Sequence, residues 1–259
     1  MPPLDPQKTI AEMRAAYAAS NTATTRNFLL MGDFGTGKSV TLSTLPPPIL
    51  YHTFDPGAVT SRLIKPKIDS GEIVVESFEA EDGKNPTEFE RFDKRMDQLQ
   101  AGGIFTSGAF RSYAIDSLTT LADFVMNFIA KKAGRAGQVP QLQDYQMQQV
   151  ILRNIITRCT ALPLFFGVSG HIKSDKDEIT GRIITSLLVS GKLDVKIPLL
   201  FDEVYVTRVT SDSKGATYSL LTGSEGLYKA RTRIGAGVFD LSEKPDLTYL
   251  LRKAGVLAE

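Results

Sequence analysis

Short apolar runs and longer amphipathic stretches alternate through the middle of the chain. Runs such as NFLLMG and PLFFGVSG are almost continuously apolar, a pattern typical of strands covered on both faces of a sheet. The longer stretches place apolar residues at helical spacing. The expected strands are 27–32, 49–54, 72–78, 110–116 and 163–170, and the expected helices are 37–45, 86–100, 117–133 and 144–161.

This alternation predicts an α/β fold with a mainly parallel sheet and helices on both faces. The pattern changes toward the C-terminus, where antiparallel strands are expected at 203–211 and 216–223 around a DSKG turn, followed by a short helix at 247–255. Another helix is expected at 6–20, before a polar linker. The expected organisation is an N-terminal helix and linker in 1–26, a core in 27–235 and a C-terminal tail in 236–259.

Composition narrows the classes of protein to consider. The chain has 259 residues, 42% of them hydrophobic, which suits one sizeable core. Thirty Lys and Arg residues against 29 Asp and Glu residues give a net charge of +1, so a polyanionic partner is neither required nor excluded. Cys159 is the only cysteine, which excludes an intrachain disulfide. Because the chain shows no signal-peptide pattern and no apolar run of membrane-spanning length, we expect a soluble cytoplasmic protein that does not contact membranes.

The apolar run at 27–32 leads into a glycine-rich turn that contains a lysine and a serine. This turn fits the phosphate-binding motif G-x-x-x-x-G-K-[ST], placed between a strand and a helix as the motif requires. In such a turn the main-chain N–H groups bind phosphate oxygens, the lysine reaches the β- and γ-phosphates, and the serine ligates Mg²⁺. ATP and Mg²⁺ are therefore the expected cofactors. The expected nucleotide-binding residues are Gly32, Asp33, Phe34, Gly35, Thr36, Gly37, Lys38, Ser39 and Val40.

A second magnesium residue is expected at the end of a neighbouring apolar strand. Asp116 closes the strand SYAID, and Ser117 opens the next helix. With a P-loop upstream, this position favours a carboxylate that holds the magnesium water shell; a helix N-cap is the alternative role. Because serine rather than glutamate follows Asp116, the adjacent general base of many ATPases is absent. The base then lies elsewhere, or hydrolysis is slow.

Two further strand ends should meet at the same edge of the sheet, where ligands bind in such folds. One ends in Asp55 and the other in His171, which is one of only two histidines. A histidine in this place suits a sensor of the γ-phosphate that switches the following loop; ordinary loop packing is the alternative. The other histidine, His52, lies inside an expected strand and is expected to be structural.

The order of these motifs resembles that of the RecA-like ATPases over roughly residues 27–235. The combination of FDPG, IDSLT, VSGH and LFDEVY is similar to the phage nucleotide-binding AAA-type family, which includes RecA-related single-strand annealing proteins. The resemblance implies a RecA-like P-loop NTPase core with antiparallel strands added at its C-terminal side. It also implies an ATP-dependent ring or filament that acts on single-stranded DNA in the cytoplasm of a bacterial host, with a single-stranded DNA-binding protein as a further partner.

The resemblance also assigns roles to individual residues. Relatives commonly place a catalytic glutamate two residues after the aspartate that ends the second strand, and Gly57 stands there in this chain. Asp55 is then the candidate substitute, unless its side chain caps the following turn. The remaining roles are phosphate binding for Lys38, magnesium binding for Ser39 and Asp116, and γ-phosphate sensing for His171.

The segment KARTRIG resembles the Lys-x-Arg-x-Gly-type element by which relatives reach the nucleotide site of a neighbouring subunit. Lys229, Arg231 and Arg233 alternate along it, so in an extended segment all three side chains project on one side. Arginine binds phosphate oxygens in bidentate fashion, which suits contact with a γ-phosphate across a subunit boundary. The alternative is a charged, solvated face on an edge strand.

DNA contacts in RecA-like relatives come from two mobile loops. The first corresponds to 130–143, a glycine-containing segment with a local excess of positive charge, and the second to 172–192, where basic and acidic residues are mixed. Neither segment carries aromatic residues for base stacking, so DNA binding is expected to be electrostatic and sensitive to salt. Solvated charges that complement a helix dipole are the alternative. The candidate DNA-binding residues are Lys131, Lys132, Arg135, Lys173, Lys176 and Arg182.

These observations favour a RecA-like ATPase that binds single-stranded DNA as an oligomer and promotes annealing or strand exchange. A nucleotide-gated assembly factor that hydrolyses poorly and binds a replication or recombination protein is the alternative. It is motivated by Gly57 and by the missing glutamate after Asp116. A small-molecule phosphotransferase is less attractive, because no arginine-rich lid is apparent in the sequence.

Overall fold

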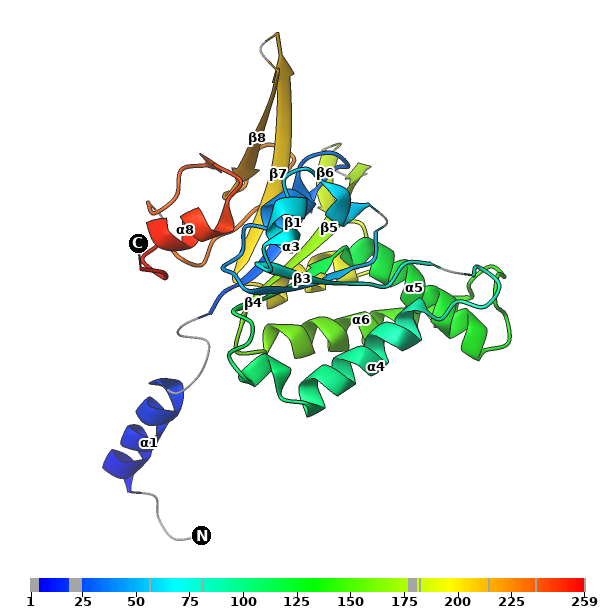
Figure 1. Cartoon of the computed structure of the whole chain (residues 1–259), viewed down its shortest axis with the longest axis horizontal. Coiled ribbons are helices and arrows are strands. Elements are labelled where there is room, and N and C mark those ends of the chain that lie inside the picture. Colours follow the sequence, from blue (N-terminus) through cyan, green and yellow to red (C-terminus); the bar gives the residue numbers. More distant parts are fainter. Residues whose placement is uncertain are drawn as a thin grey trace.

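A mainly parallel β-sheet forms the centre of the molecule (Figure 1). The computed structural model describes residues 5–18, 25–55, 57–80, 82–176, 181, 183–213, 215–235 and 237–258. The strand order within these residues is β3-β2-β4-β5-β1-β7-β8-β9, and neighbouring strands from β3 to β7 run parallel. The strands are β1 (Asn27–Gly32), β2 (Ile49–Thr53), β3 (Ile73–Ser77), β4 (Ser112–Asp116), β5 (Phe165–Lys176), β6 (Ile183–Leu187), β7 (Glu203–Asp212), β8 (Gly215–Leu221) and β9 (Ser242–Glu243).

Helices cover both faces of this sheet. The longer ones, α4 (Glu88–Ala101), α5 (Leu118–Lys132) and α6 (Leu142–Thr160), gather on one face (Figure 1). On the opposite face, residues of the shorter α2, of α8 and of the segment just before α3 share a second apolar cluster. The remaining α-helices are α1 (Pro6–Ala18), α2 (Lys38–Leu42), α3 (Lys65–Asp69), α7 (Leu193–Lys196) and α8 (Leu247–Lys253), and the 3-10 turns include η2 (Ala58–Thr60) and η4 (Pro198–Leu200).

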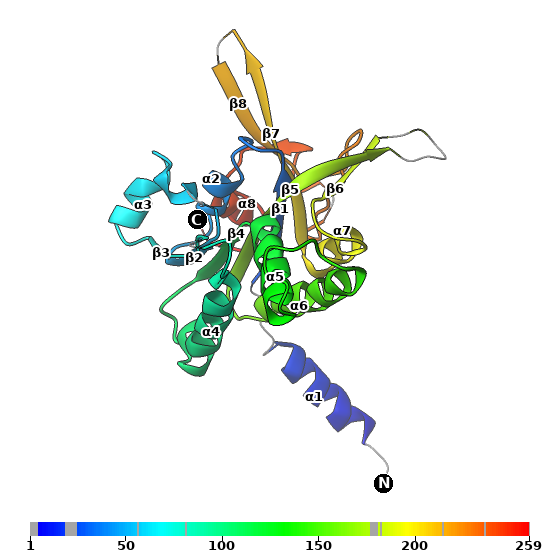
Figure 2. The ribbon, with the colours of Figure 1, turned by 90° about the vertical axis from the view of Figure 1, so that its right-hand side faces the viewer.

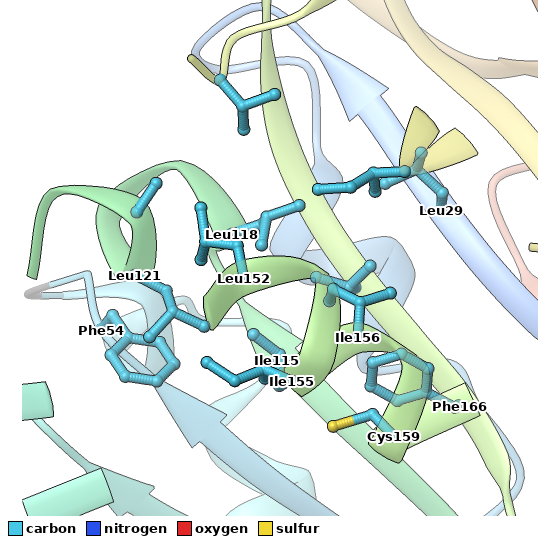
Figure 3. Close-up of a cluster of buried hydrophobic side chains, with 14 of the residues drawn as sticks. Leu29, Phe54, Ile115, Leu118, Leu121, Leu152, Ile155, Ile156, Cys159 and Phe166 are labelled. Carbon is cyan, nitrogen blue, oxygen red and sulfur yellow. The ribbon is translucent and has the colours of Figure 1, made fainter. Parts of the chain in front are cut away.

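The alternation of side chains along β1 supplies both apolar layers. Leu29 and Met31 join the cluster under α5 and α6, whereas Phe28 and Leu30 join the cluster on the opposite face. Figure 3 shows part of the first cluster, in which Ile156 of α6 packs beside Phe166 of β5. Because strand side chains alternate between faces, a strand apolar at every position fits only a sheet that is covered twice, as predicted.

The predicted fold class is confirmed, including the antiparallel β7–β8 pair at the C-terminal side. One strand is much longer than expected. The run predicted at 163–170 continues as β5 to Lys176, and its end pairs antiparallel with β6, which the sequence did not predict. The β5–β6 and β7–β8 pairs extend away from the helical layers as two arms (Figure 2).

The two ends of the chain differ in how they relate to the sheet. Helix α1 stands apart from it in both views (Figures 1 and 2). At the other end, β9 pairs with β8, and the main-chain N–H of Leu247 donates to the Thr44 hydroxyl (2.8 Å), which ties α8 to the end of α2. Among the helices that the structure describes, none has the length and hydropathy needed to cross a membrane.

Candidate nucleotide-binding site

The predicted nucleotide-site residues lie at the carboxyl ends of β1, β2 and β4 and beside these ends on β5. Gly32 at the end of β1 pairs with His171 of β5, and Thr53 at the end of β2 pairs with Asp116 at the end of β4. A cavity of about 600 Å³ opens at this edge. Its lining residues are Phe34, Gly35, Gly37, Lys38, Ser39, Val40, Thr41, Asp55, Gly57, Ser61, Leu63, Asp116, His171, Tyr218 and Pro245.

The P-loop turns tightly between β1 and α2 because glycine occupies its left-handed positions. Gly37, the residue before α2, has φ 89°, a conformation that side-chain-bearing residues rarely adopt. A Cβ atom at this position would also lie 3.3 Å from the ring of Tyr218. Substitution there would therefore strain the turn and crowd the cavity wall.

Lys38 is buried at the base of this cavity. Its Nζ donates to the main-chain oxygens of Asp33 (2.6 Å) and Gly32 (3.1 Å), and lies 3.4 Å from Nδ1 of His171. Burial lowers the pKa of the Lys38 ammonium, opposed by the Asp116 carboxylate and then by those of Asp33 and Asp55. The side chain is therefore folded back along the loop and surrounded by negative charge, close to the place where phosphate oxygens would bind.

The start of the P-loop is fixed to β7 by two hydroxyl groups. Thr36 Oγ1 and Thr207 Oγ1 are 2.7 Å apart and buried, and the Thr36 hydroxyl also donates to the main-chain oxygen of Asp33 (2.8 Å). A Cβ atom on Gly32 would lie 2.1 Å from the Thr207 hydroxyl oxygen. The first glycine of the motif is thus required by the close approach of β7.

Asp116 is buried, and each of its carboxylate oxygens accepts a hydrogen bond from a hydroxyl group. Tyr51 donates to Oδ2 (2.7 Å), and Ser169 donates to Oδ1. The Ser39 side chain lies close to the same Tyr51 phenol, so the two expected magnesium residues are near each other. Ser117, and not Asp116, is the N-cap of α5, so the alternative role of Asp116 does not apply.

This donor set fits Mg²⁺, which prefers oxygen ligands and retains several of its waters. A serine hydroxyl and an aspartate carboxylate are hard oxygen donors, and each Asp116 oxygen keeps one acceptor position after its hydroxyl bond. Ser39 and Asp116 are therefore the residues that would hold the ion and its waters. No cluster of three or more His, Cys, Asp or Glu side chains suited to a metal occurs in the described part of the chain.

Asp55 follows β2 and lines the cavity. Its Oδ1 accepts a hydrogen bond from the Thr120 hydroxyl of α5. The side chain therefore bonds to a helix of the core, and the short turn that begins at Gly57 has no side-chain cap. One carboxylate oxygen is held in place while Oδ2 has no hydrogen bond from another described residue.

His171 lies inside β5 rather than in a loop, so the expected loop after it is replaced by strand. Its main-chain N–H donates to Thr119 Oγ1 (3.0 Å), and its oxygen accepts from the N–H of Leu188 (2.8 Å). Burial, followed by the charge of Lys38, lowers the pKa of the His171 imidazole. The ring thus favours its neutral form beside the lysine.

Several side chains of this site were not identified from the sequence. Tyr51, Thr120 and Ser169 belong to this group because they act through contacts between separate elements. Leu63 and Tyr218 are exposed apolar side chains that line the cavity, and no motif in the sequence points to them. Only Ser169 could have been identified from the sequence, because it lies near the end of an expected strand, two residues before His171.

A family model described as an AAA domain (AAA_24) matches residues 24–234. The chain belongs to this AAA-domain family. Family membership supports nucleotide binding at the P-loop. None of the curated proteins matches the chain. Solved structures that resemble this AAA domain include the crystal structure of the flagellar accessory protein FlaH from Methanocaldococcus jannaschii, with 10% identity, coverage of 84% of this chain and 83% of that one, and a TM-score of 0.40.

The first expected DNA loop of this AAA domain does not present free positive charge. Lys131 and Lys132 lie in the last turn of α5, and each pairs with Glu90 at 3.1 Å. Arg135 forms a bidentate pair with the buried Asp144 carboxylate (2.7 and 2.9 Å), which also accepts the capping hydrogen bond that begins α6. All three side chains are paired with nearby carboxylates, and their contact with DNA stays a prediction.

The second expected DNA loop of this AAA domain is mostly the β5–β6 arm. Lys173 pairs with Asp175 (3.2 Å) and Asp194 (3.4 Å), whereas Lys176 at the end of β5 is exposed and forms no ion pair with another described residue. Arg182 lies outside the residues that the structure describes. The described part of this segment thus offers two lysines without an ion pair, Lys176 at the end of β5 and Lys192 just before α7.

The expected intersubunit residues of this AAA domain fall into two groups. The Arg231 guanidinium donates to the main-chain oxygens of Pro198 and Phe201, and Arg233 pairs with Asp202 at 3.1 Å. Both side chains therefore hold the segment before β7 of their own chain. Lys229 is exposed and has no hydrogen bond or ion pair with any other described residue. Contact with a neighbouring nucleotide stays a prediction for all three.

Proposed function

We propose that the chain is a Mg²⁺-dependent ATPase whose nucleotide state controls its interactions. The observation that carries this proposal is the convergence of Lys38, Ser39 and Asp116 around one cavity at the carboxyl edge of the sheet. Main-chain amides of the P-loop and the Lys38 ammonium would bind the phosphates. When bound, Mg²⁺ would neutralise phosphate charge. The apolar side chains of Leu63 and Tyr218 in the cavity lining suit the nucleobase.

Asp55 is the proposed general base. Its carboxylate lines the cavity, and the Thr120 hydroxyl fixes one oxygen so that the other can accept a proton from an attacking water. Asp55→Asn should leave nucleotide binding within about twofold of the parent and lower phosphate release about 10²- to 10⁴-fold, the usual contribution of a general base. Equal loss of binding and of turnover would assign Asp55 to nucleotide binding instead.

Nucleotide binding is tested by calorimetric titration with Mg²⁺ and ATP. Lys38→Ala should abolish measurable heat, because it removes the charge that faces the phosphates. Lys94→Ala removes an exposed lysine of α4 that is distant in sequence from the P-loop and is absent from the cavity lining, so it serves as the matched control. A parent that binds no nucleotide, or a Lys38→Ala variant that binds like the parent, would refute the proposed function.

His171 is the proposed link between the nucleotide and the β5–β6 arm. Its ring contacts Lys38, and its main-chain oxygen holds Leu188, the residue that follows β6. A phosphate that draws Lys38 away from His171 would change the contacts at the base of the arm. His171→Ala should therefore retain ATP binding and lose the nucleotide dependence of whatever the arm binds.

For the partner, we propose single-stranded DNA bound by a ring or filament of this chain, as in recombination proteins that anneal or exchange strands. Fluorescence anisotropy with a labelled oligonucleotide, at low salt and with or without ATP, tests this proposal. Replacing the unpaired Lys176 by alanine should weaken binding, whereas replacing the neutralised Lys131 and Lys132 should have little effect. Absence of binding by the parent in both nucleotide states would end the DNA proposal.

A nucleotide-gated assembly factor is the second candidate, and the neutralisation of Lys131, Lys132 and Arg135 by carboxylates favours it. In this case ATP should promote self-association or capture of a replication or recombination protein, such as a single-stranded DNA-binding protein. Sedimentation with and without ATP measures the self-association. ATP-dependent assembly together with phosphate release that DNA does not stimulate would favour this candidate over the first.

A further inference from the structure

Tyr51 is a fully buried tyrosine whose hydroxyl lies between the P-loop helix and the end of β4. It donates to Asp116 Oδ2 at 2.7 Å and lies close to the Ser39 side chain. The Tyr51 hydroxyl is therefore close to both expected magnesium residues. Its backbone belongs to β2, which neighbours β4 but not β1, so this one hydroxyl connects three separate elements.

We infer that Tyr51 is a positioning residue that holds Ser39 and Asp116 in the arrangement that receives Mg²⁺. The inference rests on the proposed function and adds to it a residue that acts through the magnesium ligands. The Tyr51 hydroxyl fixes the orientation of one Asp116 oxygen while Ser169 fixes the other, which leaves one acceptor position on each for water. Loss of a residue that orients a metal ligand in this way typically lowers metal affinity or activity.

The protonation of Tyr51 is consistent with this role. Burial, and then the charge of Asp116, raises the pKa of the Tyr51 phenol well above its usual value. The phenol therefore keeps its proton at any pH at which the protein would work and remains a donor to the carboxylate. A phenylalanine would preserve the ring in its apolar surroundings and remove only this donor.

The test measures binding of a fluorescent ATP analogue in EDTA and then at increasing Mg²⁺ concentration. In Tyr51→Phe, the Mg²⁺ concentration that gives half of the maximal increase in binding of the analogue should rise about tenfold. The reason is that loss of a partner that orients a metal ligand typically weakens metal affinity 10- to 100-fold. Affinity in EDTA should stay within about twofold, since Tyr51 is not among the residues that line the cavity. Thermal unfolding of each variant accompanies the titration.

Tyr205→Phe is the matched control. Tyr205 is also fully buried, and its hydroxyl donates to a buried carboxylate, Glu203, at 2.7 Å, away from the cavity lining. This variant loses the same kind of hydrogen bond and should keep the Mg²⁺ dependence of the parent. If Tyr51 had a purely structural role, Tyr51→Phe and Tyr205→Phe would show the same dependence of binding on Mg²⁺ concentration.

The outcomes separate this inference from the proposed function. A folded Tyr51→Phe variant with the parent's Mg²⁺ dependence overturns the inference alone, whereas a parent that binds no nucleotide overturns both. If Tyr51→Phe does not fold, the intact chain labelled with 3-fluorotyrosine supplies the readout. One buried fluorine resonance should then move when Mg²⁺ accompanies the nucleotide and not with nucleotide in EDTA; absence of such a resonance overturns the inference.

Discussion

Adding one methyl group at Gly32 should disturb both the stability of the fold and the P-loop. In Gly32→Ala the new Cβ would lie 2.1 Å from Thr207 Oγ1, 2.6 Å from Thr36 Oγ1 and 3.0 Å from the main-chain oxygen of Thr207. Ordinary contacts of a Cβ atom begin at 3.4 Å, so the Thr207 hydroxyl would have to move by more than 1 Å. The third contact involves backbone, which cannot rotate away as a side chain can.

Two costs add in this variant. Overpacking of a well-filled interior costs about 1–3 kcal/mol, and separation of the buried Thr36 and Thr207 hydroxyls costs about 1 kcal/mol more. The free energy of unfolding should therefore fall by about 2–4 kcal/mol. Since 1 kcal/mol corresponds to about 2–4 °C in a chain of this size, the melting temperature should fall by roughly 4–16 °C. Nucleotide affinity should fall as well, because Gly32 begins the P-loop.

Differential scanning calorimetry on four variants tests the reasoning. Gly83→Ala is the control, because a Cβ there meets no atom within 4 Å. Thr207→Ala in the Gly32→Ala background removes the closest contact and should recover part of the loss, while the single Thr207→Ala variant completes the cycle. A Gly32→Ala protein that melts with the parent, or a double variant whose losses simply add, would refute the steric explanation.

Three other predictions concern stability and reactivity. Hydrogen bonds from His52 and then Arg95 lower the pKa of Glu76 to about 2, so its stabilisation is present above pH 4.5 and is lost as the pH falls toward 2. Because this carboxylate is partly exposed, Glu76→Gln should remove only about 1–2 kcal/mol of that pH dependence, measured by urea unfolding between these pH values. Burial raises the pKa of the Cys159 thiol to about 12, so iodoacetamide at pH 8 should modify it only after unfolding, and rapid labelling of the native protein would contradict this. Ile156→Ala should cost about 2–5 kcal/mol by leaving a cavity between α6 and β5, whereas a loss below 1 kcal/mol would show that this part of the core collapses to fill it.

The pattern of the sequence was sufficient for the sheet and for the phosphate-binding turn. Strands covered on both faces are apolar throughout, so β1 and β4 stood out in the sequence, and the predicted bounds of β1 match the structure. Glycine spacing determines where a turn can place successive amides toward an anion, so Lys38 and Ser39 were predicted from the motif alone. Asp116 followed from its position at a strand end.

Other features depend on contacts between distant parts of the chain. β6 has only five residues, and it becomes a strand because the end of β5 supplies its hydrogen-bonding partners. The charge of Lys131 was counted as free, since the sequence does not show that Glu90 on another helix lies beside it. Tyr51 resembles any other apolar strand residue until its hydroxyl is seen to reach Asp116.

The proposed coupling between the nucleotide site and the β5–β6 arm depends on how β5 changes its pairing partners. The first part of this strand pairs with β4 and β1 in the centre of the sheet, and the last five residues pair only with β6. The change of partners falls at His171 and Ile172, beside Lys38. Five residues of strand extend roughly 17 Å, so a small rotation at His171 becomes a larger displacement at the end of the arm. The expected mechanism was a loop that becomes ordered when nucleotide binds. A strand follows His171 instead, so the proposed coupling between nucleotide and partner would act by displacing the described part of this arm.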